Sequence, residues 1–139
     1  VRVNGSLFFG AIDHVQGHLE AIDARDPRQK HVLIAASGIN FVDMAGAEML
    51  AQEARRRKRM GGGLYFYRMK DAVHAFLKRG GYLEDIPEEH LFSVKTRPVS
   101  TIYRQLDSEI CRHCTLRIFR ECHAALPNGE PRATAATTE

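Results

Sequence analysis

The sequence has few cysteines, no long apolar run and little excess charge. Its three cysteines all lie after residue 110. They are too few and too clustered for a disulfide framework, so a reducing compartment is the simpler expectation. No run of about 18 apolar residues occurs, so the sequence predicts no membrane span. The net charge of +3 is too weak a bias to indicate nucleic-acid binding. The remaining composition, 139 residues with 44% hydrophobic, suits one globular domain.

The sequence also lacks a recognisable catalytic constellation. Its seven histidines are scattered along the chain. No Ser/His/Asp order, paired-carboxylate arrangement or glycine-rich phosphate loop can be placed. We therefore expect a protein that is not an enzyme and that needs no cofactor.

Strand and helix patterns alternate along the chain. Apolar residues flank Asn4-Gly5, which predicts an opening β-hairpin over residues 1–9. Further strands are predicted at residues 31–36, 64–67 and 90–94, and helices at 13–24, 43–59, 71–79 and from 98 past 110. This order predicts an α/β fold, a mixed sheet opened by a hairpin with four to five helices. We expect one domain over residues 1–123 and a disordered Ala/Thr/Pro-rich tail over residues 124–139.

The corner from Asp43 to Gly46 joins a predicted strand to a predicted helix. Asp43 is a good N-cap residue, and the N–H groups of a helix start can hold an anion. The alternative is that Asp43 only caps the helix and the small residues permit close packing. Met44 and Ala45 supply no nucleophile, proton or metal ligand, so the corner has no evident chemistry of its own.

Two segments carry a family resemblance. INFVDMAG at residues 39–46 resembles the signature of the STAS domain, which is named for sulfate transporters and anti-sigma factor antagonists. There an apolar strand leads into Asp-Ser-[Ser/Thr]-Gly and a helix. Asp43 and Gly46 match that pattern. NGSLFFG at residues 4–10 resembles the opening of the transporter-attached branch.

The resemblance implies the cytoplasmic domain of a SulP-type anion permease, at the cytoplasmic face of the cell membrane. Its implied partners are the transmembrane portion of the same transporter and a soluble regulatory protein, with a nucleotide or anion near the corner as a lesser candidate. The first residue is not Met, which also suggests a piece of a longer polypeptide.

The sequence departs from the family pattern at the corner. Met44 stands where the anti-sigma factor antagonists carry a serine that a partner kinase phosphorylates. Neither Met44 nor Ala45 has a hydroxyl, so phosphorylation at these two positions is chemically impossible. The corner Asp43, Met44, Ala45 and Gly46 is therefore predicted to be a docking surface, to which exposed Met44 adds an apolar contact.

A basic run closes the predicted helix. It consists of Arg55, Arg56, Arg57, Lys58 and Arg59. These residues could meet anionic lipid headgroups beneath a membrane. The alternative is a solvated helix end, where cations favour the negative end of the helix dipole.

The cysteines suggest a third candidate site. Cys111 and Cys114 form a Cys-x-x-Cys pair, and Cys122 follows. Nothing between residues 110 and 121 breaks a helix, and a continuous helix would hold Cys111 and Cys122 roughly 16 Å apart, too far for one zinc. We expect small apolar cysteines on one stripe and no metal site. A metal or redox domain using Cys111 and Cys114, and a free-standing regulator of the anti-sigma-antagonist type, are the two alternatives to the transporter domain.

Overall fold

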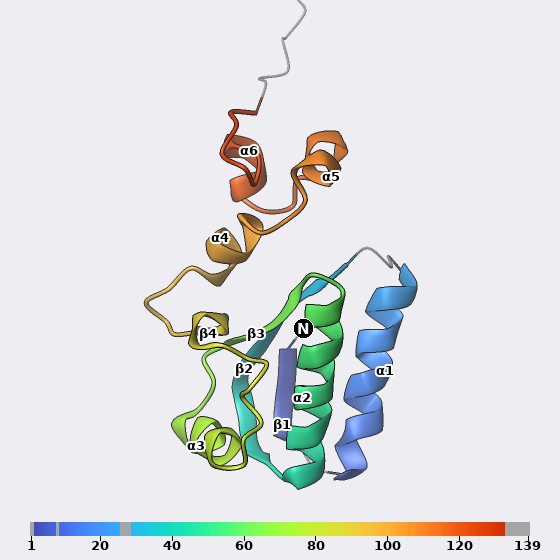
Figure 1. Cartoon of the computed structure of the whole chain (residues 1–139), viewed down its shortest axis with the longest axis vertical. Helices are drawn as coiled ribbons and strands as arrows, with labels where there is room; N and C mark the ends of the chain where they lie inside the picture. Colours follow the sequence, from blue (N-terminus) through green and yellow to red (C-terminus); the bar gives the residue numbers. More distant parts are fainter. Residues whose placement is uncertain (1, 8, 26–28, 133–139) are drawn as a thin grey trace, which may run out of the picture. The chain divides into compact units, whose positions relative to one another are not determined.

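The computed structural model describes residues 2–7, 9–25 and 29–132, with side chains from residue 15 onward. Contacts divide the chain into two compact units, Val1–Thr96 and Arg97–Glu139 (Figure 1). The first unit contains β1 (Arg2–Leu7), α1 (Phe9–Arg25), β2 (His31–Val42), α2 (Met44–Arg59), β3 (Gly63–Tyr67), α3 (Asp71–Arg79), the 3-10 turn η1 (Glu88–His90) and β4 (Leu91–Phe92). Its strands alternate with helices, so the predicted α/β class is confirmed.

The predicted opening hairpin is wrong. The described part of the chain forms one sheet with strand order β1-β2-β3-β4, and each neighbouring pair is parallel. β1 runs without a turn through Asn4 and Gly5, which lie opposite Gly38 and Ile39 of β2. β2 continues beyond the predicted end at residue 36 to Val42, so it offers hydrogen-bonding groups along the whole of β1. The turn residues are accommodated by register shifts on either side of them.

One face of the sheet carries the hydrophobic core. Val32 and Ile34 of β2 lie opposite Leu64 and Phe66 of β3, and all four are at most 5% exposed. They belong to one cluster with buried residues of α1, α2 and α3. Consecutive parallel strands joined by right-handed crossovers place their helices on the same face, and Figure 1 shows α1 and α2 side by side.

Helix α2 is positioned by a cap at its start, by a glycine turn after its end and by buried alanines between them. The Asp43 side chain caps its start, as predicted. Ala47 and Ala54 are fully buried and let the helix pack closely. The chain leaves the helix at Met60 and enters a left-handed turn at Gly61, where φ is +85°, a conformation that favours glycine.

The predicted single helix from residue 98 past 110 is also wrong. The second unit contains three short helices in its described residues, α4 (Pro98–Tyr103), α5 (Ser108–His113) and α6 (Glu121–Ala124). Asp107 starts a new helix because its side chain accepts hydrogen bonds from the N–H groups of Glu109 and Ile110. The hydroxyl of Tyr103, which is buried, donates to the Ala125 carbonyl at 2.6 Å and ties α4 to the segment after α6.

The domain boundary at residue 123 remains a prediction. Along the sequence, the boundary between the two units falls between residues 96 and 97, so the predicted domain over residues 1–123 includes most of the second unit. Within the predicted tail, Leu126 is buried and Ala125 forms a β-bridge with Pro131. Residues 133–139, the end of the predicted disordered tail, lie outside the described residues.

Candidate functional site

The corner between β2 and α2 has the geometry expected of a capped helix start. The Asp43 backbone is extended, and its carboxylate accepts a hydrogen bond from the Gly46 N–H at 2.8 Å. The Asp43 carbonyl accepts from the Ala47 N–H at 2.9 Å. An anion at this corner would lie beside a carboxylate that already uses one of the first N–H groups. Anion or nucleotide binding at the corner stays a prediction, and a bound anion would be repelled by the Asp43 carboxylate.

The corner presents two apolar side chains to solvent. Met44 is 72% exposed, and Phe41, near the end of β2, is 53% exposed. Ala45 is half-buried, whereas Gly46 is buried beneath the helix start. The sequence reasoning singled out Met44 and missed Phe41. No sequence signal indicated this exposure, because Phe41 lies two residues after buried Ile39 and regular strand alternation would place it on the same buried face.

A pocket lies at the carboxyl ends of β3 and β4. Its volume is about 610 Å³. It is lined by Ser37, Arg68, Met69, Lys70, Asp71, His74, Glu88, Leu91, Phe92, Ser93 and Val94. Lys70 donates a hydrogen bond to Asn40, which ties the start of α3 to the end of β2. The carboxyl edge of a parallel sheet is the usual ligand position in such folds, and sequence reasoning did not find this pocket.

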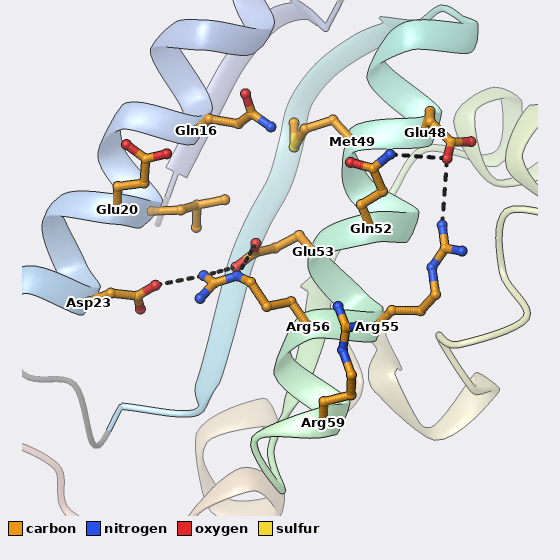
Figure 2. A pocket seen from close by; sticks show the side chains of 11 residues that line it. Gln16, Glu20, Asp23, Glu48, Met49, Gln52, Glu53, Arg55, Arg56 and Arg59 are labelled. Carbon is orange, nitrogen blue, oxygen red and sulfur yellow. Dashed lines mark hydrogen bonds and ion pairs between the residues drawn. The ribbon is translucent and has the colours of Figure 1, made fainter.

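The basic run does not form one exposed surface, because Arg57 points inward. Arg57 is fully buried, and its guanidinium lies 2.8 Å from the Asp23 carboxylate and 2.7 Å from that of Glu53. It also donates to the Gln29 carbonyl at 2.7 Å. Arg56 contacts the same two carboxylates at 2.6 and 2.9 Å (Figure 2). These contacts join the end of α2 to the end of α1.

The other cations of the run also have acidic neighbours. Arg55 lies 3.5 Å from Glu48, and both Arg55 and Lys58 approach Asp85, at 3.9 and 3.3 Å. Arg59 forms no ion pair in the described part of the chain, although it lines the groove between α1 and α2 in Figure 2. Membrane contact by the run remains a prediction, but one in which Arg57 takes no part.

The ion-pair cluster at the end of α2 also changes the acidity of Asp23. Burial acts to raise the pKa of this carboxyl. The hydrogen bond from Arg56 and the charge of Arg57 outweigh that effect, so the pKa lies below its ordinary value of 3.8. The Asp23 carboxylate is thus held ionised well into the acid range.

The cysteines do not lie on one helical stripe. Helix α5 ends at His113, and the backbone is extended at Cys114, so the expected 16 Å separation of Cys111 and Cys122 along one helix does not apply. All three thiols are half-buried. In the described residues no group of three His, Cys, Asp or Glu side chains is placed to hold a metal ion.

The two members of the Cys-x-x-Cys pair differ in acidity. Burial raises the pKa of the Cys111 thiol, and nearby Cys122 and Cys114 add to the rise. Hydrogen bonds from the N–H groups of Arg117 and Leu116 instead lower the pKa of Cys114. The sequence alone gave no sign of this difference because it depends on the turn after α5.

A model of the STAS domain matches residues 1–98, the part of the chain that holds the sheet, the corner and the first three helices. The chain belongs to the STAS domain family. The resemblance seen at Asp43 and Gly46 is thereby confirmed. No curated protein matches the chain. In the residues described, none of the helices is both long and apolar enough to cross a membrane.

Solved structures share the STAS fold of this chain. A sulfate transporter family protein from Wolinella succinogenes is 24% identical, with a TM-score of 0.58 over 68% of this chain and 76% of that chain. A structure of SLC26A9 is 18% identical, with a TM-score of 0.66 over 78% of this chain and 20% of that chain. The murine SLC26A9 anion transporter in its inward-facing state is 19% identical, with a TM-score of 0.55 over 66% of this chain and 15% of that chain. This STAS chain therefore spans a fifth or less of the SLC26A9 chains.

Proposed function

We propose that this STAS domain is the cytoplasmic regulatory and docking domain of a SulP-type anion transporter and performs no chemistry. Support comes from the family and from the fold shared with a sulfate transporter family protein and an anion transporter. The matched part of the SLC26A9 chains is small, which is the expectation for a domain attached to a much larger protein.

The observation that carries the docking role is the apolar surface at the corner. Met44 and Phe41 are both more than half exposed beside the capped start of α2. Covering what each exposes would contribute about 1–1.5 kcal/mol, or roughly 2–3 kcal/mol together. That corresponds to about 30- to 150-fold in affinity for a partner. Neither Met44 nor Ala45 can be phosphorylated, so this contact has no phosphate switch at the family's serine position.

The coding sequence of the full-length protein gives the first test. The proposal expects hydrophobic membrane spans encoded in the same open reading frame. An open reading frame without them would refute the transporter assignment, although the STAS fold would stand.

The second test is anion uptake by the full-length transporter carrying Met44→Asp. We expect reduced uptake at unchanged membrane abundance, because a carboxylate would be buried without a partner in the docked state. Met60→Asp is the matched control, since Met60 is a methionine at the opposite end of the same helix and is 36% exposed. Equal uptake by both variants and the unaltered transporter would contradict docking through the corner.

A further inference from the structure

The loop formed by residues 114–120, between α5 and α6, exposes several large apolar side chains. Leu116 is 76% exposed, Ile118 is 74% exposed and Phe119 is 45% exposed. Ile110, on α5 just before the loop, is 41% exposed. Four of the eight large apolar residues that stand exposed in the described structure therefore fall within ten positions.

The 114–120 loop is also basic. It contains Arg117 and Arg120 and no acidic residue. In the part of the chain that the structure describes, neither arginine forms an ion pair, whereas Arg112 is held by Glu109 and Glu130 at 3.3 and 2.9 Å. Arg120 is exposed and Arg117 is half-buried. Glu121, the first residue of α6, lies close enough to Arg120 to interact with its charge. The 114–120 loop can therefore present two arginines to an anionic surface, with one acidic neighbour.

The second unit fixes both ends of the 114–120 loop. Before the loop, the Cys111 carbonyl accepts a hydrogen bond from Arg132 at 2.8 Å. After it, the Ala125 carbonyl accepts the Tyr103 hydroxyl. Between these points Arg117 adopts a left-handed backbone, with φ of +41°, so the chain is neither helix nor strand. Leu116 and Ile118 are thus presented to solvent from an anchored turn, and Phe119 is about half exposed beside them.

We propose that the 114–120 loop binds the surface of an anionic lipid membrane. Leu116, Ile118 and Phe119 would enter the region between headgroups and acyl chains, while Arg117 and Arg120 contact the headgroup phosphates. Apolar side chains interleaved with arginines are the composition of interfacial membrane-binding segments. The charge complementarity selects acidic lipids over neutral ones. This inference goes beyond the proposed function, because it requires a lipid surface and uses residues of the second unit.

Flotation of the 139-residue chain with vesicles tests the proposal. We expect binding to phosphatidylcholine vesicles that contain phosphatidylserine, weaker binding to phosphatidylcholine alone, and loss of the difference at high salt. Arg117→Asn with Arg120→Gln should weaken binding to the acidic vesicles by about 25-fold, since each cation contributes about fivefold. Asn is chosen at position 117 because it tolerates the left-handed backbone. Leu116→Ser with Ile118→Ser should weaken binding by tenfold or more.

Two control variants test whether the lipid contact lies in the 114–120 loop or elsewhere on the chain. Lys58→Gln with Arg59→Gln changes two exposed cations of α2 and should leave vesicle binding within twofold of the unaltered chain. Met44→Ser should likewise leave it unchanged. Thermal unfolding verifies that each variant is folded, and Leu116→Ser alone replaces the double variant if that one is destabilised.

The outcomes separate clearly. Failure of the unaltered chain to float with acidic vesicles would overturn the proposal, and so would binding that survives the loop variants. Binding lost only in the α2 variant would also overturn it, since the lipid contact would then lie in the first unit. None of these results bears on the corner or on the transporter assignment.

Discussion

Replacing Arg57 with alanine should destabilise the first unit by about 3 kcal/mol. Arg57 is fully buried and makes three short polar contacts, with Asp23, Glu53 and the Gln29 carbonyl. Removing one partner of a buried ion pair costs about 3–5 kcal/mol because the other partner is left without its counter-charge. Arg56 keeps its contacts with both carboxylates, which places the expected loss at the lower end of that range.

The expected loss is large enough for a simple assay. For a unit of this size, 3 kcal/mol lowers the midpoint of thermal unfolding by about 12–24 °C. Circular dichroism during heating measures that midpoint, and urea titration gives the free energy of unfolding. Because the chain has two compact units, the unfolding midpoint and the free energy must both be assigned to the transition of the first unit.

Arg59→Ala is the matched control for Arg57→Ala. Arg59 lies on the same helix, is exposed and forms no ion pair in the described residues. Its replacement should change the free energy of unfolding by less than about 0.5 kcal/mol. If Arg57→Ala were also within about 1 kcal/mol of the unaltered chain, Arg57 would not be the buried centre of the ion-pair cluster.

Two further predictions follow from the acidity of single side chains. The folded-state pKa of Asp23 lies below its ordinary value of 3.8, so its contribution to stability should be complete at neutral pH and be lost as the pH falls through that folded-state pKa. Asp23→Asn should therefore reduce the acid sensitivity of unfolding, and an unchanged profile would contradict this. For the thiols, iodoacetamide near neutral pH should alkylate Cys114 before Cys111, because only the pKa of Cys114 is lowered. Peptide mass spectrometry measures the order, and faster labelling of Cys111 would refute it.

Much of the first unit could be predicted because its signals are local and agree with one another. The cap at Asp43, the buried alanines and the glycine turn after α2 all indicate the same helix. The opening segment could not be predicted, because a local Asn-Gly turn signal competes with pairing to a distant strand. β2 extends to Val42 and provides that pairing, so tertiary context overrides the turn.

The second unit shows the opposite limit of sequence reasoning. No proline or glycine interrupts residues 99–122, so periodicity alone favours one continuous helix. The break depends on Asp107, which caps a new helix, and on the distant hydrogen bond from Tyr103 to the Ala125 carbonyl. The exposed 114–120 loop exists only because of that break, so it too could not be found from the pattern.

The basic run shows why a run of like charges along a sequence need not make a charged surface. Arg57 continues the spacing of buried Ala47, Leu50 and Ala54, so it falls on the inward face of α2. Its partner Asp23 lies 34 positions earlier, which no local pattern reveals. Asp23, Glu48, Glu53 and Asp85 together set four negative charges beside the five cations of the run. Attraction to anionic lipid scales with uncompensated charge. The 114–120 loop has two arginines with no ion pair in the described residues and one acidic neighbour, Glu121. Its smaller number of cations therefore leaves it no less attractive to a membrane surface than the run, four of whose cations are held in ion pairs with four carboxylates.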